Sequence, residues 1–403
     1  MPFVVQKIIM KKYIKLLLLL IYTTSLQSQS LDSLMKIAMQ SHPSLKVADL
    51  KIKQQEALKN SGFELQPTDF YYLGQAFGYE NEYDQHDFGV RQSFELPKVY
   101  QAKNALIEAE TALLKSERVL TEVELKKMVA NLYWQVVATY QEQQVYSILD
   151  SFYNDFANLA ALRVETGETS RIELLRIESS FKSWTIQKNE TDRRYELAQR
   201  QLAYLLGREN WINVKNVDLQ QLSVNLPQVN ATNHPLMRYY EQQKNKAIKQ
   251  VTIEENKLSP TFNLGYASQI FDGNAGLNLV EIGLGVPLHR KPQQQRIEAA
   301  KMNAAIIQAK AETDKFALEN EWKLALANLE TLNGQIFSVN RFLMENVLES
   351  VALAKIGYEG GELPYFEYLS VIEQAISLRI EQIQLIQKYN ETVILINYGF
   401  GIE

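Results

Sequence analysis

Apolar residues recur at helical spacing through two very long stretches of the chain. From Val99 to Arg163 there is no proline or glycine, and apolar positions such as Leu106, Leu113 and Leu120 follow the period of a helix. At a rise of about 1.5 Å per residue, this stretch predicts a helix about 100 Å long. The stretch from Gln293 to Ile356 repeats the pattern with more alanine. The sequence therefore predicts a mainly α-helical protein built around two very long helices.

Each long helix is followed by a glycine-containing turn and by a second helix that returns beside it. We expect the returning helices at Ser170 to Leu206 and at Pro364 to Tyr398. Gly167 and Gly361 stand where a helix ends in the left-handed conformation, and Thr169 or Ser170 is suited to cap the next helix. The pattern predicts two long helical hairpins, with their tips at these glycines.

Alternation of apolar and polar residues predicts β-strands between the helices. We expect four strands, at 68–79, 87–96, 262–270 and 280–286, although the first alternates less regularly than the others. Turns are expected at Glu80 to His86 and at Asp272 to Asn278. Strands with one apolar and one polar face fit either a soluble sheet that lies on a core or a membrane barrel with a wet lumen.

The chain is an internal duplication. Four landmarks of the first half recur in the same order about 190 to 194 residues later, for example His42-Pro43 as His234-Pro235. Each half should therefore run helix, two strands, long helix, turn and long helix, and the first half should open with a helix from Pro43 to a stop at Gly62. We divide the chain into an N-terminal segment (1–28), a first repeat (29–207), a connector with short structure of its own (208–232) and a second repeat (233–403).

The N-terminal segment is typical of a secretory signal. Four lysines precede an apolar run, which small and polar residues follow after Tyr22. The apolar run is about ten residues long, whereas a membrane-spanning helix needs about 20. We expect cleavage near Ser28 and export from the cytoplasm; an uncleaved anchor is the alternative.

Composition excludes several classes of function. The chain has no cysteine, so it forms no disulfide, thiolate metal site or lipid-modified cysteine. The signal carries four of the 42 basic residues and none of the 47 acidic ones, so the remaining chain is acidic, which argues against a nucleic-acid partner. The four histidines lie far apart and no nucleotide or zinc motif occurs. We expect no enzyme, cofactor or metal site, and we assign His42 and His234 to helix starts.

Together these features resemble the TolC-like outer-membrane efflux proteins. The resemblance covers residues 30–401 and rests on the signal, the duplicated halves with His-Pro near each start, strands that run into Leu96-Pro97 or Val286-Pro287, and Gly-Glu-x-x-x-x-Glu-x-Leu at the hairpin tips. It implies a mainly α fold with a small β part, in which duplicated α-hairpins form a periplasmic helical barrel. Four strands per chain would contribute to the 12-stranded transmembrane β-barrel of a homotrimer. Independently, four strands are too few for a membrane barrel, which needs about eight.

The resemblance also implies a function and partners. The protein would be a passive efflux or export channel in the outer membrane of a Gram-negative bacterium, surrounded there by lipid and with a large periplasmic portion. A periplasmic adaptor and an inner-membrane pump would be its partners, and the pump would choose the substrate. The hairpin tips would form the gate and dock the adaptor; the matching positions are Arg163, Gly167, Glu168, Thr169, Ser170, Tyr358, Gly361, Glu362, Leu363 and Pro364.

Two alternatives stay open at this point. Glutamates near the tips would make a cation-attracting ring if several of them face the lumen, or they are ordinary solvated charges at helix ends; they are Glu165, Glu168, Glu359 and Glu362. For the whole chain, the alternative is a secreted coiled-coil scaffold or adhesin without a pore, in which the strands serve only as oligomer caps.

Overall fold

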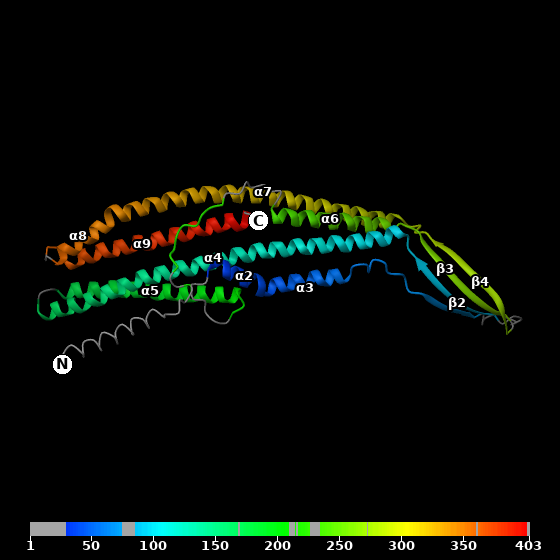
Figure 1. The fold of residues 1–403 in the computed structure, drawn as a ribbon, viewed down its shortest axis with the longest axis horizontal. Helices are drawn as coiled ribbons and strands as arrows, with labels where there is room; N and C mark the ends of the chain where they lie inside the picture. The colour runs from blue at the N-terminus through cyan, green and yellow to red at the C-terminus, as the bar shows by residue number, and fades with distance from the viewer. Residues whose placement is uncertain are drawn as a thin grey trace, which may run out of the picture. The chain divides into compact units, whose positions relative to one another are not determined.

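The first repeat folds in the predicted order. The computed structural model describes residues 30–74, 85–167, 170–208, 214, 217–225, 234–271, 273–359 and 362–400. Its first half contains α2 (Leu31–Ser41), α3 (Pro43–Ala57), β1 (Asp69–Gly74), β2 (Gln85–Phe94), α4 (Pro97–Glu165) and α5 (Arg171–Leu205) (Figure 1). The predicted long helix and its returning partner are therefore confirmed. The N-terminal helix α2 was not predicted; the hydroxyl of Ser30 caps it by accepting the amide of Ser33 at 3.3 Å.

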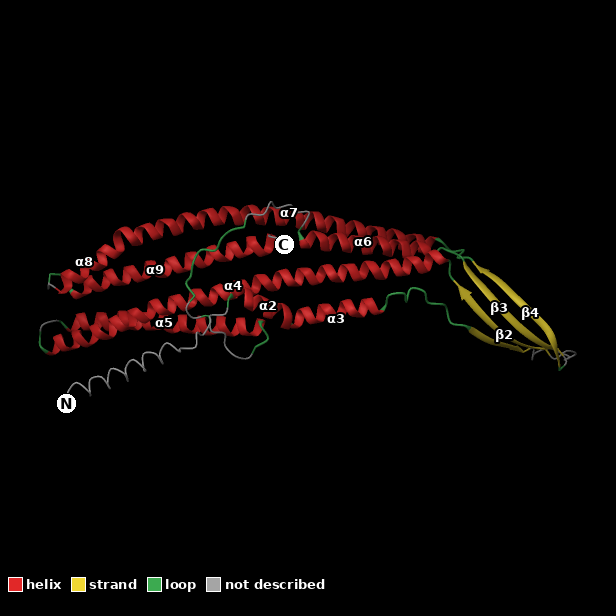
Figure 2. Cartoon of the chain, in the orientation of Figure 1, coloured by secondary structure: helices red, strands yellow, loops and turns green. Residues whose placement is uncertain are grey.

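The second repeat has the same order of long elements. It contains α6 (Pro235–Asn256), β3 (Thr261–Phe271), β4 (Asn274–Gly285), α7 (Lys291–Phe342), the π-helix η2 (Leu343–Val347), α8 (Leu348–Glu359), α9 (Tyr365–Ile394) and the π-helix η3 (Leu395–Phe400). Helices account for most of the described chain (Figure 2). The predicted continuous helix from Gln293 to Ile356 is wrong at one point, because η2 interrupts it, whereas α4 is unbroken over 69 residues.

The two histidines beside prolines cap equivalent helices, as the sequence predicted. Nδ1 of His42 accepts the backbone amide of Ser44 at 3.3 Å, and Nδ1 of His234 accepts that of Leu236 at 3.1 Å. The proline that follows each histidine occupies the first helical position, where no hydrogen-bond donor is needed. Nε2 of His234 also lies 2.6 Å from the carbonyl oxygen of Gly399, so this ring joins the start of α6 to η3.

The predicted stop of the opening helix at Gly62 is wrong. Helix α3 ends at Ala57, and the residue with positive φ in the following turn is Asn60, at 72°. Gly62 is needed for a different reason, since its amide donates to Oδ1 of Asn104 at 3.1 Å. A Cβ at this position would lie 2.4 Å from that same oxygen, so the glycine permits a close approach of the turn to α4.

The four strands form one antiparallel sheet in the order β1-β2-β3-β4. The central β2–β3 pair joins the two repeats, with Phe94 opposite Phe262. The predicted turn at Asp272 to Asn278 is too long: Gly273 turns with a φ of 74°, and β4 begins at Asn274. Most of the predicted turn at Glu80 to His86 lies outside the described residues, as does the strand predicted beyond Gly74.

By its internal contacts the chain divides into two compact units, and the boundary falls inside α4, α7 and α9. One unit contains Met128–Leu222 and Thr331–Glu391 with the start of the chain up to Ala38; the other contains Met39–Lys127, Ser223–Glu330 and the remainder from Thr392. Each unit thus combines segments of both repeats. The first holds the hairpin tips, and the second holds the sheet.

The described residues of the connector are 208, 214 and 217–225, and none of them belongs to a helix or a strand. Asn390 of α9 and Asn397 of η3 both form hydrogen bonds to its backbone. In the first unit, the side chain of Asn390 accepts the amide of Leu222 and donates to the carbonyl of Gln220, both at 2.9 Å. In the second unit, the side chain of Asn397 bonds the amide of Asn225 and the carbonyl of Ser223, both at 3.0 Å.

Candidate functional sites at the hairpin tips and on the sheet

The tip of the first hairpin is a glycine turn between α4 and α5. Gly167 has a φ of 75°, as predicted, and a Cβ there would meet no atom within 4 Å, so the backbone conformation alone favours glycine. Ser170 caps α5, because its hydroxyl accepts the amide of Glu173 at 3.3 Å. Glu165 is exposed at the end of α4. Glu168, Thr169 and the side chain of Arg163 lie outside the described residues.

The tip of the second hairpin is built differently. The amides of Glu362 and Leu363 both donate to the carbonyl of Gly357, at 2.9 and 3.0 Å, which folds the turn back against α8. Tyr358 and Tyr368 then stack across the hairpin, with ring centroids 5.1 Å apart and planes 7° from parallel.

The turn continues directly into α9. The carbonyl of Pro364 accepts the amides of Glu367 and Tyr368 and so begins the helix, while the Glu362 side chain is exposed. Gly361 and the side chain of Glu359 lie outside the described residues. The cation-attracting ring of glutamates and the left-handed turn at Gly361 therefore remain predictions.

Exposed aliphatic and aromatic side chains flank both tips at equivalent positions of the two repeats. Leu162 and Ile172 are 57% and 66% exposed around the first tip. Ile356 and Phe366, each 194 residues further along, are 66% and 48% exposed around the second. Sequence reasoning missed this set, although the repeat alignment already places the four residues in register.

One face of the sheet is apolar and exposed. The strand register places nine apolar side chains on this face, each between 43% and 83% exposed: Phe70, Tyr72, Phe88, Phe262, Leu264, Tyr266, Val280, Ile282 and Leu284. No other described part of this chain covers them. A contiguous apolar surface of this kind marks contact with a membrane or with another protein.

The opposite face of the sheet consists mainly of polar and small residues, although Leu73, Leu277 and Leu279 also lie on it. The guanidinium of Arg91 donates twice to Oε2 of Glu281, at 2.8 and 3.2 Å, across the intervening strand β3. Gly265 lies between the two in the register, and a Cβ there would come within 3.2 Å of the Glu281 carboxylate. The glycine therefore leaves room for the bridge. The two charged side chains on this face therefore neutralise each other.

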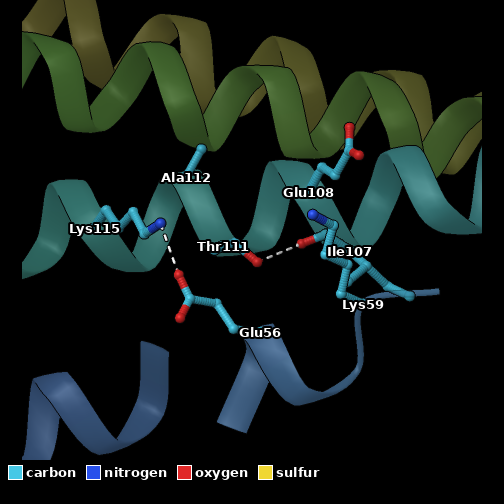
Figure 3. A pocket seen from close by; sticks show the side chains of 7 residues that line it. All are labelled: Glu56, Lys59, Ile107, Glu108, Thr111, Ala112 and Lys115. Atoms are coloured by element: carbon cyan, nitrogen blue, oxygen red, sulfur yellow. Dashed lines mark hydrogen bonds and ion pairs between the residues drawn. The ribbon is translucent and has the colours of Figure 1, made fainter. Parts of the chain in front are cut away.

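A hollow of about 270 Å³ lies between the end of α3 and α4 (Figure 3). It is lined by Glu56, Lys59, Ile107, Glu108, Thr111, Ala112 and Lys115. Lys115 pairs with Glu56 at 2.8 Å, and both side chains are about half exposed. Two lysines and two glutamates leave the hollow without net charge, so it has no marked preference for an ionic ligand.

The described residues contain neither a candidate metal site nor a helix suited to cross a bilayer. No group of three or more histidine, aspartate or glutamate side chains there could hold a metal ion. Among the same residues, no helix combines the length and the apolar character that crossing a bilayer requires. The features that stand out are therefore surfaces: the two tips and the two faces of the sheet.

Solved structures resemble this chain over nearly its whole length, although no protein-family model and no curated protein sequence matches it. CusC, whose structures are described as showing conformational changes during folding and transmembrane channel formation, matches with a TM-score of 0.78 at 16% identity, over 94% of this chain and 93% of CusC. The Campylobacter jejuni outer-membrane channel CmeC matches with a TM-score of 0.79 at 14% identity, over 92% and 85% of the two chains.

The open state of the Neisseria gonorrhoeae outer-membrane channel MtrE gives the same result. It matches with a TM-score of 0.77 at 15% identity, over 93% of this chain and 89% of MtrE. Coverage above 90% of this chain leaves room for neither the helical hairpins nor the sheet to lie outside the match. The chain therefore has the TolC-like fold of these outer-membrane channels, which confirms at the level of the fold the resemblance seen in the sequence.

Proposed function

We propose that this protein is the outer-membrane channel subunit of a Gram-negative efflux or export system, with a large periplasmic portion. The observation that carries the proposal is the sheet. One face is apolar and exposed, the other is mainly polar or small and carries the Arg91–Glu281 bridge, and among the described residues β1 and β4 each pair with a strand on one side only. An apolar outer face suits lipid, and a polar inner face suits a water-filled lumen. The CusC, CmeC and MtrE structures support the proposal, because these channels share the fold of this chain.

The duplication supports closure of the sheet by further copies of the chain. Within one chain the second strand of the first repeat, β2, pairs with the first strand of the second repeat, β3. The equivalent strands β4 and β1 are the free edges of the sheet. The β4 of one copy can therefore pair with the β1 of the next, as β2 pairs with β3. A single sheet of four strands is too small to close, since membrane barrels need about eight or more; three copies give the 12 strands expected from the resemblance.

The hairpin tips are the proposed gate and docking site for a periplasmic adaptor joined to an inner-membrane pump. The apolar pairs at Leu162 and Ile172 and at Ile356 and Phe366 support a docking role, because they are exposed on both tips at equivalent positions. Conduction itself is passive in this proposal. The exported substrate is set by the pump.

Membrane fractionation and planar-bilayer recording test the proposal together. The purified protein should be extracted by detergent from the outer membrane as an oligomer, and it should give discrete conductance steps in a bilayer. Recovery as a soluble protein without conductance would instead support the scaffold or adhesin.

The glutamate ring has its own test. Replacing Glu165, Glu168, Glu359 and Glu362 with glutamine should shift the reversal potential in a salt gradient away from cation preference, because a ring of carboxylates attracts cations. An unchanged reversal potential would leave these glutamates as solvated charges at helix ends.

A further inference from the structure

The apolar row on β4 continues beyond the end of the strand. The last strand residue of this row is Leu284, and β4 ends at Gly285. Apolar residues then recur at the same spacing of two, at Val286, which is 44% exposed, and at Leu288, which is 84% exposed. The exposed apolar surface therefore extends into the connection between β4 and α7.

Cations stand immediately after this row. Arg290 and Lys291 follow Leu288 closely and are both exposed, and neither forms an ion pair with another described residue. The sequence has no acidic residue between Glu281 and Glu298. The positive charge after β4 is therefore not neutralised by neighbours along the chain.

The first repeat has the same arrangement where β2 passes into α4. The apolar row of β2 ends with Phe94, Leu96 follows two residues later, and Lys98 is exposed two residues after that. Lys98 forms no ion pair with a described residue, and no acidic residue lies between Glu95 and Glu108. Because β2 already pairs with strands on both sides, no strand of a further copy can pair with it. Contact between copies therefore does not explain the cation after β2.

The helices do not account for the two lysines either. Lys98 lies in the first turn of α4 and Lys291 in the first turn of α7, and neither first turn contains an acidic residue. The first turn of a helix carries partial positive charge, so a cation there lowers the stability of the helix. Two equivalent helices thus begin with a charge that opposes their own dipole, which favours a role for that charge outside the helix.

An exposed aromatic ring lies beside the same junction. Phe63, in the connection from α3 to β1, is 63% exposed, and its ring centroid lies 4.9 Å from that of Tyr100. Tyr100 follows Lys98 by two residues at the start of α4. Aromatic side chains form girdles where the apolar band of a barrel meets water. Apolar row, aromatic ring and cations together match the tails, interface and headgroups of one lipid leaflet.

The opposite end of the sheet differs in charge. The segments 75–84 and 272–273, which join paired strands, contain no basic residue and four acidic ones, Glu80, Glu82, Asp84 and Asp272. The apolar face is therefore bordered by cations at the helical end and by acidic residues at the other. Since the helices are periplasmic in the proposed function, the cationic edge meets the periplasmic leaflet.

We propose that Lys98, Arg290 and Lys291 bind the phosphate groups of anionic phospholipids in the periplasmic leaflet of the outer membrane. The apolar face and this cationic edge then form one lipid-binding surface, which fixes the depth of the sheet in the membrane. The proposal rests on the proposed function, which places the apolar face in lipid. Arginine and lysine both bind phosphate, and near an anionic surface each strengthens binding about fivefold.

Spin-labelled lipids test this preference directly. The purified oligomer is reconstituted in phosphatidylcholine vesicles, and electron spin resonance measures the fraction of spin-labelled phosphatidylglycerol or phosphatidylcholine that the protein immobilises. We expect the unaltered protein to prefer phosphatidylglycerol. The triple variant Lys98→Gln/Arg290→Gln/Lys291→Gln should lose this preference, by up to about fivefold for each cation. Equal affinity of the unaltered protein for the two lipids would overturn the proposal.

Two control variants separate the edge from net charge. Exposed lysines of α3 and α7 provide a charge-matched triple variant that should keep the preference, Lys46→Gln/Lys53→Gln/Lys323→Gln. The charge-retaining variant Lys98→Arg/Lys291→Arg should keep it as well, because arginine also binds phosphate. Loss of the preference in either control would overturn the assignment to these cations.

A second copy is the alternative occupant of the edge after β4. When β4 pairs with the β1 of the next copy, the connection before that β1 brings an acidic residue, Glu64, to the same end of the sheet. If Arg290 paired with it, Glu64→Gln and Arg290→Gln should lower the thermal midpoint of the oligomer equally, even in phosphatidylcholine alone. We expect instead that Glu64→Gln leaves the lipid preference and the midpoint unchanged. Equal losses would overturn the proposal in favour of a contact between copies.

The depth of the edge can be measured because the chain has no cysteine. A spin label is attached to a single introduced cysteine, and its collisions with oxygen, which is enriched in lipid, and with a nickel chelate, which stays in water, report its depth. Ile282→Cys should place the label in the hydrocarbon, Leu288→Cys at the headgroups and Gln294→Cys in water. Equal nickel access at Leu288→Cys and Gln294→Cys would overturn the proposal.

Conductance separates this proposal from the proposed function. A silent protein with the expected lipid preference and depths would contradict the channel alone. A conducting protein without the lipid preference would contradict the lipid-binding edge alone.

Discussion

At the scale of single residues, glycines perform three separate tasks that composition does not distinguish. Gly167 turns the chain with a positive φ, Gly62 lets a turn approach Asn104, and Gly265 leaves room for a salt bridge to cross a strand. Only the turn at Gly167 follows from a local pattern, because this glycine stands between the end of one helix and the residue that caps the next. The other two depend on which side chain lies opposite, and this is set by packing and by strand register.

Two glycine substitutions of the same kind should have opposite effects. Gly167→Ala should destabilise the protein by about 1 to 2 kcal/mol, because alanine is strained at a φ of 75°. Gly334→Ala should stabilise it by up to about 1 kcal/mol, because Gly334 lies inside α7 with open space around it and alanine is a better helix former. Far-UV circular dichroism of the purified protein during thermal unfolding measures both changes in stability. Equal shifts in the same direction would contradict the assignment.

At the scale of elements, the helices are held by apolar cores and by a small number of buried polar contacts. The ion pair of Glu142 and Arg194 is the clearest case, because the glutamate side chain is 1% exposed and the arginine side chain is 39% exposed. Removing one partner of a buried pair costs more than removing both, since an unpaired buried charge remains. The polar contact therefore matters less for net stability than for fixing which helices are neighbours.

A double-mutant cycle measures this asymmetry. Breaking a buried ion pair by removing one partner costs about 3 to 5 kcal/mol. Arg194→Leu should destabilise the protein by up to about 3 kcal/mol, at the lower end of this range, because the arginine side chain is partly solvated. The double variant Glu142→Leu/Arg194→Leu should recover much of that loss, since no charge is left unpaired. Arg193→Leu, which breaks only the exposed pair with Glu190, is the control and should change stability by less than about 1 kcal/mol. Additive losses in the double variant would contradict the argument.

At the scale of the whole molecule, the described chain leaves both edges and one apolar face of its sheet without a partner. The helical hairpins can bury their cores within one chain, but the edge strands leave backbone hydrogen-bonding groups for a further strand, which in the proposed function comes from another copy. Assembly and membrane insertion are therefore linked in the proposed function.

The same substitution at two adjacent residues of β4 should affect membrane insertion differently, because the two side chains lie on opposite faces of the sheet. Val280→Lys places a charge on the apolar face and should oppose insertion by about 2 to 4 kcal/mol near the bilayer midplane. Leu279→Lys places the charge on the polar face, which Leu279 shares with Glu281, and should leave insertion nearly unchanged. The measurement is the detergent-extracted oligomer recovered from outer membranes. Equal loss in both variants would argue against a lipid-facing surface.

The long helices, the histidine caps and the alternation of the strands follow from the sequence, because each depends on residues close together along the chain, and the duplication follows from comparing its two halves. It misplaced the stop at Gly62, missed α2 and the π-helix η2, and did not find the exposed apolar pairs at the tips. The pairing of Arg91 with Glu281 and the meeting of Tyr153, Trp184 and Glu373 became visible only in the folded chain. Those contacts join residues about 190 to 220 positions apart, and their geometry depends on how the two repeats pack, which no local pattern encodes.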